Sequence, residues 1–254
     1  MTRAGIQVSS LKPYLTTEEE VAKTFRRLGE MGCRMVQLQW IDPSVPAPAI
    51  AGALEKSGMI SVSTQDYYEE VSAHLSETLL LNRLCGSYHV CVSGIPKEYR
   101  SREGCIVFAG ELNALSRKLE EKGMVLSFHP RKQEYDLFDG ISGVELIMEN
   151  TRWEVCLGLD LYHVCKAGLN GAEWIRRYAP RIDFVHFKDF LRLPDGSEKL
   201  VPVGQGDIEW APMVKACLEE EIPWAFAEQE SWDRDAFVCM QESFEWLIAQ
   251  GFVR

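Results

Sequence analysis

Four acidic or imidazole side chains each follow a short apolar run of the kind that forms a buried β-strand. The four runs are MVLSFH at 124–129, WEVCLGLD at 153–160, IDFVH at 182–186 and PWAFAE at 223–228. Glu134 comes soon after the first run, and Asp160, His186 and Glu228 end the other three. Because the carboxyl ends of all strands in a parallel barrel meet at one rim, we expect these four side chains to converge.

Two glutamates, one aspartate and one histidine make an oxygen-rich set of ligands with a single imidazole. Such a set suits one divalent ion, either Mn²⁺, Co²⁺, Mg²⁺ or Zn²⁺. The sequence therefore predicts a metal-dependent enzyme that acts on a small sugar or polyol.

Polar residues near these positions are candidates for substrate binding. They are His129 and Arg131 in FHPRKQEY, His163 in LDLYH and Lys188 in HFKDF. The guanidinium of Arg131 is suited to a substrate phosphate or carboxylate, although pairing with surface acids is an alternative. His163 lies just beyond Asp160, where it would bind substrate or support a ligand.

The HFKDF motif also has a structural interpretation. In HFKDF, Asp189 could bind backbone amides at the end of the strand while Lys188 stays solvated.

In AEQE, Glu230 is the alternative to Glu228 as the site residue, because residues two apart on a strand share a face. Glu228 is preferred, since the strand pattern places it nearer the rim. Asp207 is a candidate N-cap for the helix that follows it.

Strand-like and helix-like segments alternate along the whole chain. The expected strands are 5–11, 34–40, 59–65, 87–95, 124–129, 153–160, 182–189 and 223–230. The expected helices are about 16–32, 47–57, 67–84, 103–122, 141–150, 170–178, 210–221 and 235–250. Eight such units without a glycine-rich dinucleotide motif favour one (β/α)8 TIM barrel, in a single domain over residues 1–254.

Charge and cysteine usage restrict the possible partners and the compartment. A net charge of −11 argues against nucleic-acid binding, which needs clustered basic residues. The eight cysteines form no CxxC pair, and the chain has neither a signal-peptide stretch nor a membrane-length apolar run. We therefore expect free thiols in a cytoplasmic protein without membrane partners, and a homodimer or homotetramer is a common outcome for such enzymes.

The order of motifs resembles that of one known family. LSFHPRKQEY, GLDLYH, VHFKDF, VGQGDIEW and AEQE are similar to the sugar phosphate isomerase/epimerase family of xylose-isomerase-like TIM barrels. That family includes inosose dehydratases, ketose 3-epimerases, hydroxypyruvate isomerases and endonuclease IV. The resemblance spans nearly the whole chain, including the opening GIQVSSL.

The resemblance implies a divalent metal ion held by Glu134, Asp160, His186 and Glu228. It also implies proton transfer next to a carbonyl through a metal-stabilised enediolate, with Glu134 and Glu228 as the acid/base pair. Some relatives place the first ligand at the strand end itself, so His129 is the alternative to Glu134.

The chain departs from the pattern of the family at two further strands. Many relatives have a glutamate on the second strand and a histidine on the third, where this chain has Gln37 in VQLQW and Gln65 in STQDY. Amides can bind sugar hydroxyls but are poor general bases. An inosose-type dehydratase (a lyase acting on a cyclic polyol) and a non-catalytic sugar-binding barrel are therefore alternatives to the isomerase or epimerase.

Overall fold

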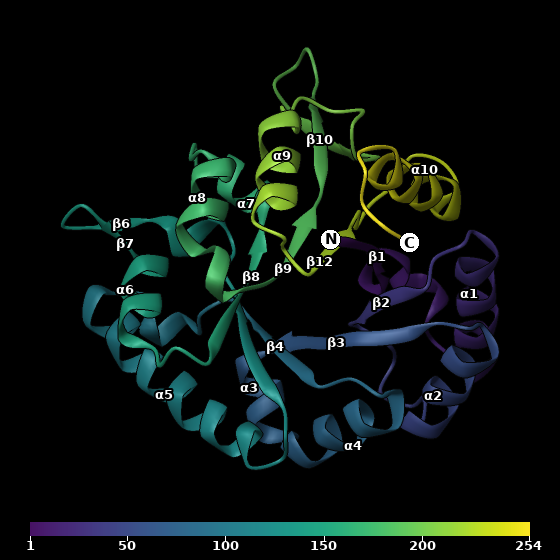
Figure 1. Ribbon diagram of the computed structural model, residues 1–254, viewed down its shortest axis with the longest axis horizontal. Coiled ribbons are helices and arrows are strands. Elements are labelled where there is room, and N and C mark those ends of the chain that lie inside the picture. Colours follow the sequence, from purple (N-terminus) through teal and green to yellow (C-terminus); the bar gives the residue numbers. More distant parts are fainter.

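The computed structural model describes residues 1–254, and at its centre eight parallel strands close into a barrel (Figure 1). Neighbouring strands follow the order β1-β12-β9-β8-β5-β4-β3-β2 around the barrel. Their bounds are β1 Arg3–Gln7, β2 Met35–Leu38, β3 Ile60–Tyr67, β4 His89–Ser93, β5 Val125–His129, β8 Val155–Asp160, β9 Ile182–Phe187 and β12 Trp224–Ala227. The predicted (β/α)8 barrel is therefore confirmed.

Helices form an outer ring around the barrel (Figure 1). The α-helices are α1 Glu18–Glu30, α2 Ala47–Lys56, α3 Tyr68–Ala73, α4 Leu75–Cys85, α5 Arg102–Glu120, α6 Gly143–Asn150, α7 Leu161–Lys166, α8 Gly171–Tyr178, α9 Ala211–Glu219 and α10 Ala236–Ala249. Short 3₁₀ helices are η1 Val8–Tyr14, η2 Lys97–Tyr99, η3 Lys132–Tyr135 and η4 Ala179–Arg181. Their apolar faces join the strands in one core, so the helices hold the barrel closed.

The first helix shows how local sequence sets an element's ends. The hydroxyl of Thr17 accepts a hydrogen bond from the Glu20 amide at 3.2 Å, which satisfies one of the free amides at the start of α1. Three glutamates in the first turn complement the positive end of the helix dipole. Gly32, with a φ of 84°, redirects the chain into β2.

Several boundaries differ from the sequence prediction. The expected strand 5–11 ends at Gln7 and continues as η1, and the expected helix 67–84 is divided into α3 and α4. The division falls at His74, whose φ of −118° and ψ of 38° are not helical. The short helix α7, directly after β8, was not predicted. These differences all lie at the carboxyl ends of strands or beyond them, where the chain builds the rim.

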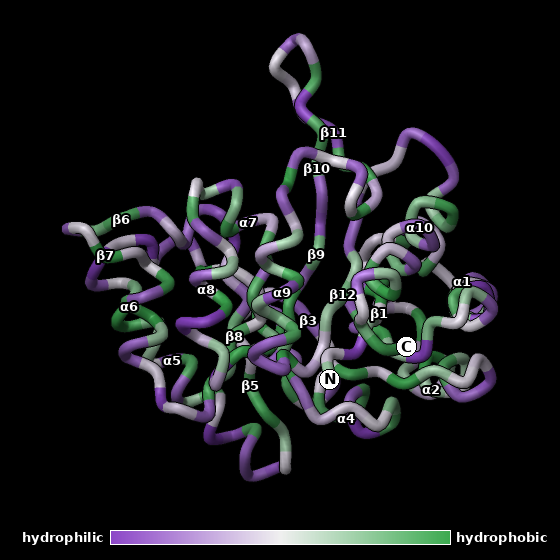
Figure 2. The backbone as a smooth tube through the Cα atoms, turned by 45° about the horizontal axis from the view of Figure 1, so that its top comes forward, coloured by the Kyte–Doolittle hydropathy of each residue, from purple (hydrophilic) through white to green (hydrophobic).

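The loop after β9 contains an antiparallel hairpin, β10 Asp189–Arg192 and β11 Glu198–Val201, that projects from the rim (Figure 2). A short pair, β6 Leu137–Phe138 with β7 Ile141–Ser142, lies in the loop after β5. The buried carboxylate of Asp189 holds the larger loop together. It accepts hydrogen bonds from the indole of Trp210 and from the amides of Phe190, Gly204, Gly206 and Ile208. The structural interpretation of Asp189 is therefore confirmed.

The expectation that Asp207 caps the following helix is wrong. Helix α9 begins after Trp210 without a side-chain cap, and the Asp207 carboxylate instead accepts a hydrogen bond from the Arg192 amide at 2.8 Å. The hairpin β10–β11 brings Arg192 close to this carboxylate, an arrangement that the local spacing of residues could not reveal.

Two phenylalanine rings fill the barrel interior below the rim. A Cβ on Gly158 would lie 2.4 Å from the ring of Phe184, and one on Gly5 would lie 2.7 Å from the ring of Phe226. Only glycine leaves room for these rings. Phe184 stacks under His186 at 5.0 Å between ring centres, so the polar residues at the rim stand on an apolar floor.

The cysteines are free, as expected. None of the eight forms a disulfide, and most are buried. Burial raises the pKa of Cys33 to about 12, because its effect is larger than that of the backbone hydrogen bonds that oppose it. The thiol is therefore protonated. None of the helices combines the length and the apolar character needed to cross a membrane.

Candidate metal centre at the barrel rim

Four predicted side chains converge at the carboxyl end of the barrel. His129 ends β5, Asp160 ends β8, His186 lies in β9 and Glu228 follows β12 directly. These four strands are consecutive neighbours around the barrel. All four side chains are buried, with exposed fractions between 0% and 5%.

The donor atoms of these side chains lie close together. His129 Nε2 is 3.2 Å from His186 Nδ1 and 3.7 Å from Asp160 Oδ2. His186 Nδ1 is 3.0 Å from Glu228 Oε2. Donor atoms bound to one tetrahedral zinc ion lie about 3.3 Å from one another. One donor atom from each of His129, Asp160 and His186 lies within 4.8 Å of the others, which fits a single divalent ion, and among these three Glu228 contacts His186.

The opposite nitrogen of each imidazole has its own partner. His186 Nε2 donates to Gln37 Oε1 at 2.6 Å, which directs the lone pair of Nδ1 toward the cluster. His129 Nδ1 lies 3.2 Å from the hydroxyl of Ser93, so its Nε2 is the atom that faces His186. Such partners are typical of metal-binding histidines, because they fix the tautomer and the ring orientation.

The cluster also has buried oxygen atoms without hydrogen-bond donors. Asp160 Oδ2 and Glu228 Oε2 are fully buried, and neither accepts a hydrogen bond. A buried carboxylate oxygen without a donor is costly unless a cation neutralises it. The nearest cation is the ammonium of Lys188, 3.5 Å from Asp160 Oδ2 and 3.7 Å from Glu228 Oε2, and a metal ion at this place would share these two oxygens with it.

Lys188 brings a positive charge into the same cluster. Its ammonium lies 3.5 Å from Asp160 Oδ2, 3.7 Å from Glu228 Oε2 and 3.3 Å from Glu230 Oε2, and only 3% of the side chain is exposed. The alternative of a solvated Lys188 is therefore wrong, and its role in substrate binding stays a prediction. Lys188 directly follows β9, two residues after His186, and its buried side chain lies beside Asp160 and Glu228 in the barrel mouth.

The cluster sets the protonation of its carboxylates. Burial alone would raise the pKa of Glu228, but the ammonium of Lys188, together with the contact to His186, outweighs it and lowers the pKa to about 2. Burial likewise opposes ionisation of Asp160, and His163 and Lys188 hold its pKa well below the usual range. Both carboxylates are ionised at neutral pH.

Glu134 lies apart from the close group of His129, Asp160 and His186. It belongs to η3, and its carboxylate accepts hydrogen bonds from the amides of Arg131 at 2.6 Å and Ile95 at 3.3 Å. Burial raises its pKa, and these two amides oppose the rise. In this arrangement Glu134 joins the loop after β5 to the loop after β4, and its role as a ligand stays a prediction.

The other predicted residues surround the cluster. His163 Nε2 lies 3.6 Å from Asp160 Oδ2, and burial lowers the His163 pKa to about 4, so the ring is neutral. Gln65 donates to Gln39 at 3.4 Å instead of joining the ligands. Gln37, expected to bind substrate, contacts His186 instead, and Ser93, which the sequence did not single out, contacts His129. Only the pairing of neighbouring strands reveals these two contacts.

Comparison with solved structures shows which barrels the chain is similar to. A sugar phosphate isomerase/epimerase from Parabacteroides distasonis superimposes with a TM-score of 0.83 at 17% identity, over 100% of this chain and 96% of that one. An L-ribulose 3-epimerase gives 0.76 at 16% identity, over 98% and 94%. The IOLI protein with a bound zinc atom gives 0.76 at 13% identity, over 98% of both chains.

These likenesses establish that the chain has the xylose-isomerase-like barrel fold. No family model matches the sequence, and no curated protein matches it either. Since fold alone does not determine activity, the function has to be argued from the residues at the rim.

Proposed function

We propose that the protein is a metal-dependent isomerase or epimerase of small sugars, with its active site at the carboxyl end of the barrel. The observation that carries this proposal is the set of four buried donor atoms that lie 3.0–3.7 Å apart in successive contacts. The similarity in fold to a sugar phosphate isomerase/epimerase and an L-ribulose 3-epimerase supports the same class of reaction.

We assign the metal ion to His129, Asp160, His186 and Glu228. His129 replaces Glu134 as the first ligand, because the carboxylate of Glu134 is bound by two backbone amides. Two imidazoles and two carboxylates suit Zn²⁺, Co²⁺ or Mn²⁺ better than Mg²⁺, which prefers oxygen ligands. An ion bound there supplies a Lewis acid that polarises a substrate carbonyl.

The chain's own residues handle the proton. The ionised Glu228 accepts the proton from the carbon next to the substrate carbonyl and returns it to the neighbouring carbon in an isomerisation; in an epimerisation the second acid, on the opposite face, would be Glu134. The ammonium of Lys188, 3.7 Å from Glu228, is positioned to stabilise negative charge that develops on a substrate oxygen. The neutral His163 donates to or accepts from a substrate hydroxyl. The apolar floor around Phe184 excludes water from below.

A product-resolved assay tests this function. We would incubate the purified protein with a panel of aldoses, ketoses and inososes, and identify the products by chromatography and NMR. We expect isomerised or epimerised sugar, with activity lost on chelation and restored by a divalent ion. Dehydrated product from an inosose would instead assign a lyase, and no conversion with any ion would contradict the proposal.

Gln37 should be a positioning residue for the metal ion. Replacement by leucine removes the acceptor of the His186 Nε2–H bond, so we expect the affinity for Co²⁺ to fall about 10–100-fold. Isothermal titration calorimetry measures this affinity. Gln65→Leu is a matched control, because Gln65 lies on the adjacent strand and contacts Gln39 instead of a ligand. Equal losses in both variants would show that Gln37 has no specific role.

A further inference from the structure

Gln7 ends β1 and belongs to the opening GIQVSSL motif, to which the proposed function gives no role. It faces Gln37 in the register between β1 and β2, and both side chains are fully buried. Gln7 Nε2 donates to Gln37 Oε1 at 3.0 Å, and the same oxygen accepts from His186 Nε2 at 2.6 Å. Three buried side chains therefore form one hydrogen-bonded row that ends on a proposed metal ligand.

The row begins at a backbone amide, which fixes its direction. The amide of Ser9, in the first turn of η1, donates to Gln7 Oε1 at 3.4 Å. Because a backbone N–H can only donate, it selects the oxygen of Gln7 and leaves Gln7 Nε2 to face Gln37. That donor requires the oxygen of Gln37, and the oxygen in turn requires a proton on His186 Nε2. The backbone thus determines which nitrogen of the imidazole carries the proton.

Gln37 has no further partner that would hold its amide in this orientation. Its Nε2 is fully buried and donates to no acceptor. If the amide rotated by half a turn, Gln37 Nε2 would donate to His186 Nε2, and the proton of the ring would lie on Nδ1. Glu228 favours that arrangement, because its Oε2 lies 3.0 Å from His186 Nδ1 and accepts no hydrogen bond. The donor of Gln7 opposes the rotation, so Gln7 decides between the two tautomers.

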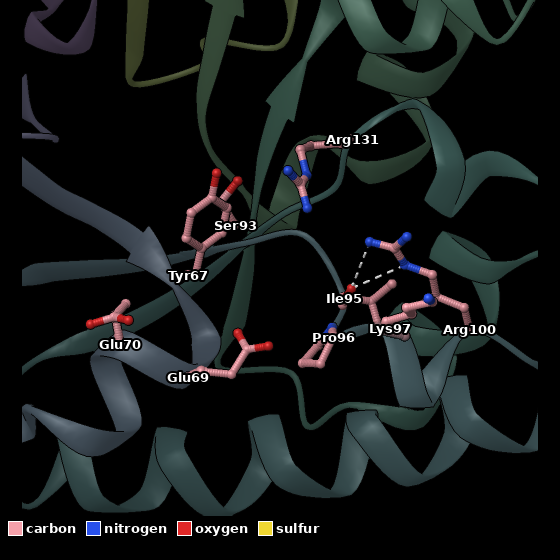
Figure 3. A pocket seen from close by; sticks show the side chains of 9 residues that line it. All are labelled: Tyr67, Glu69, Glu70, Ser93, Ile95, Pro96, Lys97, Arg100 and Arg131. Carbon is pink, nitrogen blue, oxygen red and sulfur yellow. Dashed lines mark hydrogen bonds between the residues drawn. The ribbon is translucent and has the colours of Figure 1, made fainter. Parts of the chain in front are cut away.

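The other proposed histidine ligand has a different kind of partner. The Ser93 hydroxyl, 3.2 Å from His129 Nδ1, can both donate and accept, so it serves either tautomer of that ring. Ser93 and Arg131 also line a cavity of about 340 Å³ between the loops after β3, β4 and β5 (Figure 3). Of the two histidines, only His186 therefore has a row of partners that fixes its tautomer.

We propose that Gln7 is a positioning residue that, through Gln37, keeps the lone pair of His186 Nδ1 directed at the metal site. A neutral imidazole binds a metal ion only through its unprotonated nitrogen. Without Gln7 the proton would move to Nδ1, the atom that faces His129 and Glu228, and an ion would have to displace it. The role toward the ion rests on the proposed function, whereas the tautomer of His186 can be measured without any ion.

Nitrogen NMR of the metal-free, ¹⁵N-histidine-labelled protein tests the proposal at mildly alkaline pH, where the rings are neutral. The signals of His186 are assigned by their loss in His186→Gln. We expect the proton on Nε2 in the wild type and mainly on Nδ1 in Gln7→Met, which removes the donor without adding a charge. Gln65→Met is the matched control on β3, because its amide contacts Gln39, and it should leave the proton on Nε2.

A second variant separates the donor from the contact with the backbone. Gln7→Asn can still accept from the Ser9 amide but is too short to reach Gln37, so it should shift the tautomer as Gln7→Met does. Both variants should bind Co²⁺ about tenfold more weakly than the wild type in calorimetry. A proton on Nδ1 in the wild type, or one that stays on Nε2 in both variants, would overturn the proposal. The expected tautomers in a wild type that binds no Co²⁺ would instead contradict the proposed function.

Discussion

Glu228→Gln is expected to lower kcat by about 10³-fold while leaving the fold intact. The substitution keeps the shape of the side chain but removes the ionised carboxylate that contacts His186 at 3.0 Å and Lys188 at 3.7 Å. Both the proton acceptor and one proposed metal ligand are lost together. The measurement is steady-state kinetics on the sugar that the screen identifies, with circular dichroism to verify folding.

Two companion variants make the kinetic result specific. Glu209→Gln removes an exposed carboxylate and controls for the change in net charge. Glu134→Gln separates the two candidate carboxylates: because amides of the neighbouring loops bind Glu134, we expect it to lower kcat far less than Glu228→Gln does. An equal or larger loss in Glu134→Gln would return the catalytic role to Glu134.

Lys188→Met is expected to destabilise the metal-free protein by about 3–5 kcal/mol at neutral pH. The substitution leaves Asp160, Glu228 and Glu230 without the ammonium that lies within 3.7 Å of all three. A bound divalent ion would then be the only cation available to the same oxygens. We therefore expect Co²⁺ to bind the variant more tightly than the wild type and to restore most of its stability.

Urea denaturation with chelator and with Co²⁺ measures both effects. Lys199→Met serves as the control, because Lys199 pairs with Asp233 at 2.8 Å on the surface, with 42% of its side chain exposed. Such an exposed pair is screened by solvent and contributes little to stability. If Lys188→Met cost no more than this control, or if Co²⁺ gave it no extra stability, the proposed competition between ammonium and metal would be wrong.

The positions of the strand ends could be predicted from sequence, because a barrel sends every strand end to one rim. Asp160, His186 and Glu228 end apolar runs, and the structure brings them together. The spacing of the strand-like segments and the order of the motifs predict which residues lie at the rim. No contact between distant residues was needed to place them.

The details at the rim depend on loops, and the sequence did not determine them. A short 3₁₀ turn binds Glu134 to backbone amides and leaves His129, at the strand end, to face the cluster. Lys188 was expected to bind substrate, with a solvated position as the alternative; it directly follows β9 and lies buried beside Asp160 and Glu228. Asp189, its neighbour, points the other way and organises the hairpin loop. A shift of one residue along the chain therefore decides whether a side chain enters the polar cluster, as at Lys188, or the hairpin loop, as at Asp189.

The most direct test of the metal centre is a Co²⁺ titration of the purified, chelator-treated protein, followed by visible absorption and checked by elemental analysis. We expect one ion per chain for the wild type and for Glu134→Gln, and none for the Asp160→Ala/His186→Ala double variant. Binding that survives in the double variant, or a wild type that takes up no ion, would contradict a metal centre built on His129, Asp160, His186 and Glu228.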